Sequence, residues 1–230
     1  GNVFAAIIGF FVLGLSYILK LKFEETYGNA ETMRRQSLLS ESLGWLISET
    51  QFSEWRLLAG EKLLNKLEAR TTDHKYYQTD VILGAKRMLE MTAESAFWTR
   101  HLYYYLRKFV TATLAGSTLL FVGVITFTST DIVNASATLK IVYAVYLLLP
   151  LVLSLDLLSW AIRLGRLIDE IRIIEASLEL VSKESGLGES KVLRLVSEYN
   201  CQVVSGFPIP SWFFKRYHDR VEHLWNKRKS

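Results

Sequence analysis

The sequence predicts an all-α membrane protein with three transmembrane helices and a helical cytoplasmic region. Residues 3–19, 109–127 and 141–162 form apolar runs, and Asp156 is the single charged residue within them. About 20 apolar residues are enough for a helix to cross a bilayer. The rest of the chain is charged and has apolar residues at helical spacing. These two observations predict the fold class, and the distribution of basic residues predicts its topology.

Basic residues lie on one side of the predicted spans. Lys20 and Lys22 follow the first run, Arg107 and Lys108 precede the second, and Arg163 follows the third. Residues 128–140 are polar and short, so the last two spans form an antiparallel hairpin with an outer loop. The positive-inside rule then places most of the polar sequence in the cytoplasm.

Four segments follow from this topology. They are a transmembrane helix (1–19), a cytoplasmic helical insert (20–108), a transmembrane hairpin (109–162) and a cytoplasmic helical tail (163–230). Gly44 and Gly60 weaken the helical pattern of the insert, so we expect two helices or one helix with a break, and then a helix over 81–107 that runs straight into the second span. The third span continues as one rod with a buried stripe, which consists of Leu164, Leu167, Ile171, Ile174 and Leu178. Helices then follow "GLGES" and "GFPIP".

Asp156 is a candidate pore or gate residue. Even on lenient scales, an aspartate near the bilayer centre costs roughly 2.5–3.5 kcal/mol. It lies either on an ion path or at the inner interface, bonded to water or to hydroxyls of another helix. Pro150 precedes it and is expected to kink the span at a gate.

Small and hydroxyl-bearing residues are spaced along the spans. Ala112, Gly116 and Gly123 form a small-residue face, and Ala5 and Gly9 repeat that spacing in the first span. Such faces allow helix backbones to approach closely, which favours a packing role. Thr113 and Ser117 form a neighbouring hydroxyl stripe that either lines a wet path or bonds across helices.

The tail interleaves cations with aromatic rings. Its candidate contacts to a phosphate are Lys215, Arg216, Arg220, Trp212 and Tyr217. This composition suits stacking on bases and pairing with phosphates. It equally suits a helix on an anionic membrane surface, so a nucleotide and a lipid remain alternatives.

Several function classes are excluded by composition and motif. The 27 Lys and Arg residues against 23 Asp and Glu residues give a net charge of +4, which fits a membrane protein with basic inner flanks better than a nucleic-acid binder with a basic face. One cysteine, Cys201, excludes an intrachain disulfide. No phosphate-binding loop, dinucleotide fingerprint or nucleophile elbow occurs, and the histidines lack metal-ligand spacing with one another. We therefore expect no enzyme, cofactor or metal.

Two stretches resemble a known family. "KYYQTD" with "AKRMLEMTAESAFWTRHL", and the tail "FPIPSWFFKRYHDRVEHLW", are similar to the four-transmembrane effectors associated with nucleotidyltransferases of bacterial antiphage signalling systems (CBASS and relatives). The chain departs from that family in showing three spans, so a fourth would precede Gly1.

The resemblance implies an oligomeric channel in the bacterial inner membrane. A cyclic or linear oligonucleotide messenger, made by a linked nucleotidyltransferase, would bind on the cytoplasmic side and open the pore, with loss of membrane integrity. The partners would be the messenger, further copies of the chain and the lipid bilayer. The alternative is a membrane-tethered scaffold whose cytoplasmic helices bind a protein partner.

Overall fold

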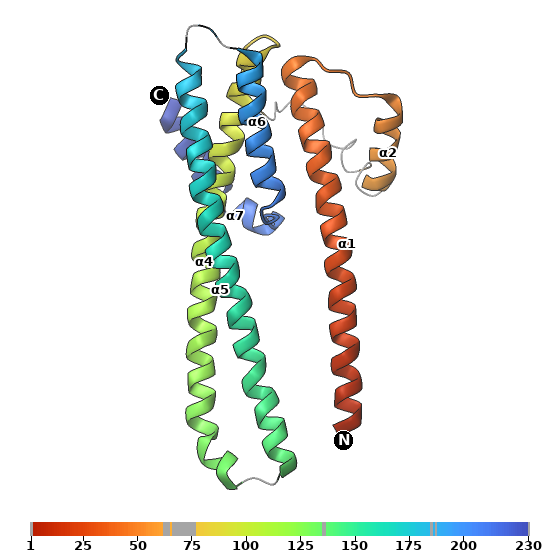
Figure 1. Cartoon of the computed structure of the whole chain (residues 1–230), viewed down its shortest axis with the longest axis vertical. Helices are drawn as coiled ribbons and strands as arrows, with labels where there is room; N and C mark the ends of the chain where they lie inside the picture. The colour runs from red at the N-terminus through yellow and green to blue at the C-terminus, as the bar shows by residue number, and fades with distance from the viewer. Residues whose placement is uncertain are drawn as a thin grey trace. The chain divides into compact units, whose positions relative to one another are not determined.

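The computed structural model describes residues 2–61, 65, 77–134, 137–184, 186 and 188–229. Within them the elements are all helices (Figure 1), as the sequence predicts. Their bounds are α1 Asn2–Leu43, α2 Glu49–Ala59, α4 Ala85–Asn134, α5 Ala137–Ser182, α6 Glu189–Val204 and α7 Ser211–Lys229.

The prediction of transmembrane helices is wrong. In the part of the chain that the structure describes, no helix combines the length and the apolarity needed to cross a membrane. The predicted spans 3–19, 109–127 and 141–162 lie in α1, α4 and α5.

Three predictions are corrected by this finding. They are the fold class of a membrane protein with three transmembrane helices, the classification as a membrane ion channel or pore, and the multi-pass location in the bacterial inner membrane. The all-helical part of the predicted fold class is confirmed.

The chain divides into two compact units. Unit 1 contains Gly1–Ala93 and Leu178–Val204, and unit 2 contains Glu94–Ser177 and Ser205–Ser230. The division falls inside α4 and inside α5.

In unit 1, α1 packs against α6. The buried face of α6 consists of Val192, Val196, Tyr199, Asn200 and Val203, which recur at helical spacing. The Tyr27 hydroxyl donates a hydrogen bond to the Val203 carbonyl at 2.9 Å. The Arg34 guanidinium donates to Asn200 Oδ1 at 3.0 Å and to Glu31 at 2.8 Å. The side chains of Tyr27, Arg34 and Asn200 are therefore paired between these helices, as buried polar groups usually are.

Helices α1 and α2 end directly before Gly44 and Gly60, the two glycines that weaken the helical pattern of the insert. Both glycines have positive φ, 74° and 72°, and they follow directly after α1 and α2. A capping box begins α2: the Gln51 amide donates to Ser48 Oγ at 3.2 Å, and the Ser48 amide donates to Gln51 Oε1 at 3.3 Å. The Leu46 side chain, in the connection between these helices, is 99% exposed.

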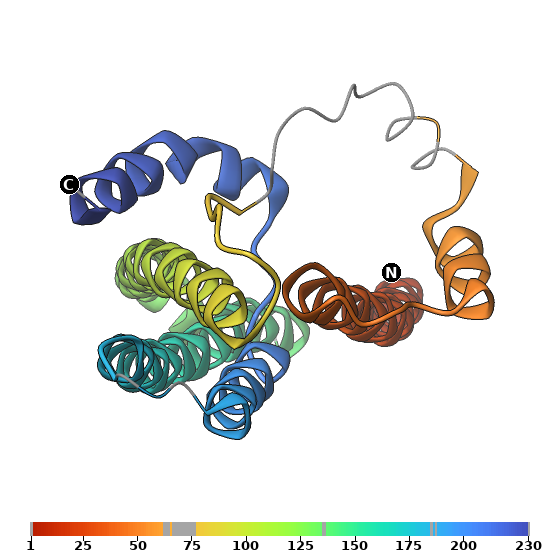
Figure 2. The same cartoon turned by 90° about the horizontal axis from the view of Figure 1, so that it is seen from above.

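In unit 2, α4 and α5 lie side by side and antiparallel (Figures 1 and 2). The expected continuity of both helices is confirmed, although α4 begins at Ala85 instead of residue 81, directly after Gly84 with its φ of 143°. The predicted α5 stripe is confirmed as buried, from Leu164 in unit 2 to Leu178 in unit 1. Helix also extends into the predicted loop 128–140, to Asn134 on one side and from Ala137 on the other.

Helix α7 packs on α4 within unit 2. Their shared core contains Phe97, Leu102, Tyr105, Phe213, Val221 and Trp225. Figure 2 shows α7 lengthwise where α4 and α5 are seen nearly end-on, so α7 crosses them. This arrangement leaves the other face of α7 exposed, and most of the candidate phosphate contacts lie on it.

Candidate functional site

The segment before α7 is anchored to α4 and α5. The Tyr103 hydroxyl donates to the Phe207 carbonyl at 3.0 Å, and the Arg163 guanidinium donates to the Ser205 carbonyl at 2.8 Å. The ring of Phe207 lies 5.1 Å from that of Trp160. Pro210 ends the segment, and its carbonyl accepts the Phe214 amide at 2.9 Å in the first turn of α7. These contacts fix where α7 begins.

Two of the predicted contact residues meet at Tyr105. The Tyr217 ring stacks on the Tyr105 ring with centroids 4.5 Å apart and planes 12° from parallel. The Arg220 guanidinium lies over the Tyr105 ring at 5.2 Å, a cation–π geometry. Tyr217 is half-buried and therefore serves mainly to hold Arg220 and α7 in place.

The remaining predicted contacts are on the solvent side of α7. Trp212 is 55% exposed and meets Phe109 edge-on at 5.9 Å. Arg216 and Lys215 are exposed. Trp212, Arg216 and Arg220 are one helical turn apart in succession, so they share one face, which we call the α7 face. Within the described residues, no carboxylate pairs with Arg216 or Arg220.

A buried ion cluster holds the C-terminal end of α7. Glu175 Oε2 accepts from Arg100 Nε at 2.6 Å, and Glu175 Oε1 accepts from Arg228 Nη1. The Glu175 side chain is 6% exposed. Both guanidinium groups also lie over the Phe97 ring, at 5.9 and 5.5 Å. Arg228, a cation of the tail, therefore forms part of the fold.

The imidazole of His101 lies beside this cluster. Its Nδ1 donates to the Phe97 carbonyl at 2.8 Å, and its ring is tilted by 37° against that of Phe97, with centroids 4.0 Å apart. Burial lowers the pKa of His101, and the positive charges of Arg100 and Arg228 lower it further, against the opposing effects of the Phe97 hydrogen bond and of Glu175.

This lowered pKa predicts that the protein loses stability in acid. Because the unfolded chain binds the His101 proton more readily, protonation favours unfolding. The contribution of His101 to the free energy of unfolding does not change with pH above 6.5, the ordinary pKa of histidine. Below that pH the contribution becomes unfavourable to the folded state. We expect His101→Gln to remove this dependence, measured as the difference between the urea-unfolding free energies of the two proteins from pH 7.5 to pH 5. Parallel pH curves would contradict the assignment.

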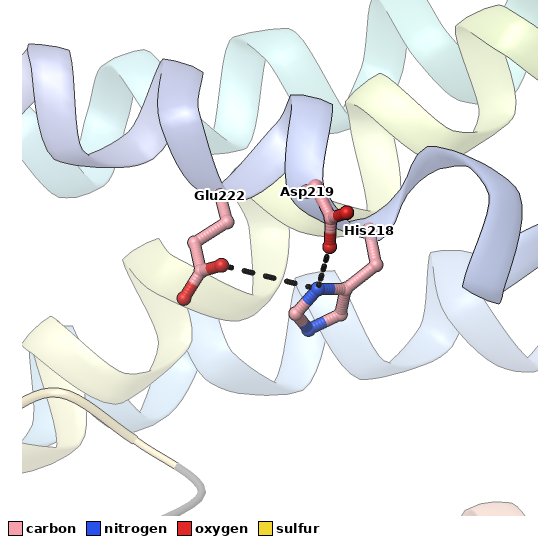
Figure 3. A group of neighbouring side chains, drawn as sticks. All are labelled: His218, Asp219 and Glu222. Atoms are coloured by element: carbon pink, nitrogen blue, oxygen red, sulfur yellow. Dashed lines mark hydrogen bonds and ion pairs between the residues drawn. The ribbon is translucent and has the colours of Figure 1, made fainter.

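A cluster that the sequence analysis missed lies on α7 (Figure 3). His218 Nδ1 is 3.2 Å from Asp219 Oδ1 and 3.9 Å from Glu222 Oε2. The imidazole packs beside Trp98, at 5.2 Å, and Phe214, at 5.3 Å. The sequence signal was the spacing of His218 and Glu222 by one helical turn, which a search for spacings between histidines does not detect.

The predicted pore and gate residues are separate from this site. Asp156 is exposed on α5. The Thr113 hydroxyl donates to the Phe109 carbonyl at 3.0 Å, and that of Ser117 to the Leu114 carbonyl at 2.9 Å, both within α4. Pro150 lies in α5, but its side chain is outside the described residues. No observation tests these positions as functional residues, and the membrane context in which they were predicted is contradicted.

Two of the predicted packing residues, Gly116 and Gly123, show no close helix contact among the described residues. A Cβ placed at Gly116 or Gly123 would meet no atom of the described residues within 4 Å. Ala112 is exposed on the same helix. Ala5 and Gly9 lie in α1, outside the residues whose side chains are described. The packing role of these residues stays a prediction.

Comparison with known proteins identifies no relative of the chain. The chain matches no family model, and neither the curated proteins nor the solved structures contain a match to it. The resemblance to nucleotide-responsive effectors therefore stays a prediction based on the two sequence stretches alone.

Proposed function

We propose that the chain is a non-enzymatic binding protein that recognises a phosphate-bearing nucleotide on the α7 face. The observation that supports this function is the succession of an exposed indole and two exposed arginines along one side of α7. The pore part of the earlier expectation is dropped, because the described helices include none able to cross a membrane.

The chemistry of the α7 face matches the two parts of a nucleotide. A base stacked on an aromatic side chain contributes about 1–3 kcal/mol, and Trp212 offers an exposed ring for this contact. A guanidinium can donate two parallel hydrogen bonds to one phosphate. Arg216 and Arg220 are one turn apart, so both can reach phosphates attached to a nucleoside stacked on Trp212.

Arg220 is the better organised of the two cations. Its cation–π contact with Tyr105, itself stacked on Tyr217, restricts the side chain before any ligand binds. Restricting a side chain in advance reduces the entropy lost on binding. Lys215 adds a further positive charge beside Arg216.

Arg220→Gln is expected to weaken nucleotide binding at least tenfold. The substitution removes charge-assisted hydrogen bonds that contribute about 1.5–3 kcal/mol. Binding is measured by calorimetry against a panel of cyclic and linear oligonucleotides at low salt, with thermal unfolding to confirm the fold. The matched control is Arg194→Gln, which removes an exposed arginine of α6 that pairs with Glu198.

The outcomes separate the alternatives. Binding of one nucleotide that weakens in Arg220→Gln and is unchanged in Arg194→Gln supports the proposal. Equal losses of nucleotide affinity in both variants would indicate general attraction to positive charge. A folded protein that binds no member of the panel would overturn the proposal. Assembly into homo-oligomers and a link to a nucleotidyltransferase stay predictions from the family resemblance.

A second candidate is a scaffold that binds a protein partner. The observation that favours it is α2, a helix without a buried residue that exposes the side chains of Leu57 and Leu58. If no nucleotide of the panel binds, the scaffold is the favoured function.

A further inference from the structure

Three possible metal ligands converge on the surface of α7. One ligand atom each of His218, Asp219 and Glu222 lies within 4.8 Å of the other two. In Figure 3 the carboxyl groups of Asp219 and Glu222 both face Nδ1 of the His218 ring. The cluster uses none of the residues of the α7 face, so an inference about it does not rest on the proposed nucleotide binding.

The separations match those of donor atoms around one small metal ion. Zinc binds histidine nitrogen at about 2.0–2.1 Å and carboxylate oxygen at about 2.0–2.2 Å in tetrahedral geometry. Two donors in such a site are therefore roughly 3.4 Å apart. The 3.2 Å separation, a hydrogen bond in the structure, and the 3.9 Å separation from Nδ1 lie on either side of this value, and all three ligand atoms lie within 4.8 Å of one another, so rotation of the two carboxylates can close the site around one ion.

The fold restrains the imidazole and leaves room for a further ligand. Trp98 of α4 and Phe214 of α7 both contact the His218 ring, which limits its rotation. The His218 and Glu222 side chains are about 40% exposed, and Asp219 is fully exposed, so water can occupy the fourth position. Two carboxylates also balance the charge of a divalent cation.

We propose that His218, Asp219 and Glu222 bind a Zn²⁺ ion, with water as the fourth ligand. An imidazole with two carboxylates suits zinc better than Mg²⁺ or Ca²⁺, which prefer oxygen ligands alone. A structural role in the fold is not required, since core contacts and the Glu175 cluster already anchor α7. The site therefore adds a metal to a helix that is already folded.

The test is a titration of the purified, metal-free chain with ZnCl₂ in a calorimeter, and with CoCl₂ in a spectrophotometer. Tetrahedral Co²⁺ absorbs strongly in the visible range, which reports the coordination geometry. We expect one site per chain, at least tenfold weaker binding in His218→Gln and in Glu222→Gln, and loss of the cobalt band in both variants.

Two control variants distinguish this site from adventitious binding. His223→Gln removes an exposed histidine of the same helix, and Cys201→Ser removes the exposed thiol of α6; both should bind zinc as the unchanged chain does. The proposal is overturned if the unchanged chain binds no zinc, if His218→Gln binds as well as the unchanged chain, or if His223→Gln weakens binding equally.

Discussion

Glu175→Ala is expected to lower the free energy of unfolding by about 3 kcal/mol. Glu175 accepts hydrogen bonds from both Arg100 and Arg228 and is almost fully buried. Without its carboxylate, two guanidinium groups beside the Phe97 ring lose the buried negative charge that they share. Removal of one partner of a buried ion pair costs about 3–5 kcal/mol. The expected cost is at the lower end of this range because the side chains of both arginines are partly exposed to solvent.

The measurement is a urea titration followed by tryptophan fluorescence, with Glu170→Ala as the control. Glu170 lies on the same helix and in the same unit, but its side chain is exposed, so its loss should cost no more than about 0.5 kcal/mol. Removing Arg228 as well should relieve the repulsion, and the double variant should then be no less stable than Glu175→Ala. A loss in Glu175→Ala no larger than that in Glu170→Ala would refute the role of the cluster.

The α5 stripe illustrates what the sequence could predict. Leu164, Leu167 and Ile171 recur with the period of a helix, and each is buried. Periodicity is a local property, so it predicts which face of a helix is buried. Glu175 interrupts that face, and a charge at such a position indicates a buried partner. Its partners come from α4 and α7, distant in sequence, and no local pattern identifies them.

The membrane assignment was based on runs with little or no charge, among them 109–127 and 141–162. On α4 the hydroxyl groups of Thr113 and Ser117 were interpreted as features within a span. In the described residues they are part of a helix that is not apolar enough to cross a membrane.

The candidate site was predicted in part. The alternation of rings and cations in the tail correctly indicated an amphipathic helix, and α7 has that form. Which cations stay exposed depends on the direction in which α7 packs. In the structure Arg228 pairs with Glu175, whereas Arg216 is exposed on the α7 face. That division follows from tertiary contacts and could not be obtained from composition.

Phe213→Ala is expected to lower the free energy of unfolding by about 3–5 kcal/mol and to release α7 from α4. Phe213 is 1% exposed and belongs to the core shared with Phe97 and Tyr105. Its ring lies 4.7 Å from that of Tyr217 and 6.2 Å from that of Phe109. Truncation leaves a cavity at the start of α7, where few other side chains can move in to fill it. The stacked pair Tyr105–Tyr217 and the Arg220 contact above it lose their support.

The adjacent residue supplies a matched control. Phe214 is 39% exposed and contacts Trp98 at 6.0 Å, so Phe214→Ala should cost about 1 kcal/mol. Urea titration gives the stability of both variants, and amide hydrogen exchange shows where protection is lost. In Phe213→Ala the amides of α7 should exchange faster, while those of α6 keep their protection, because α6 belongs to unit 1. Unchanged protection of α7 would mean that Val221 and Trp225 hold the helix without Phe213.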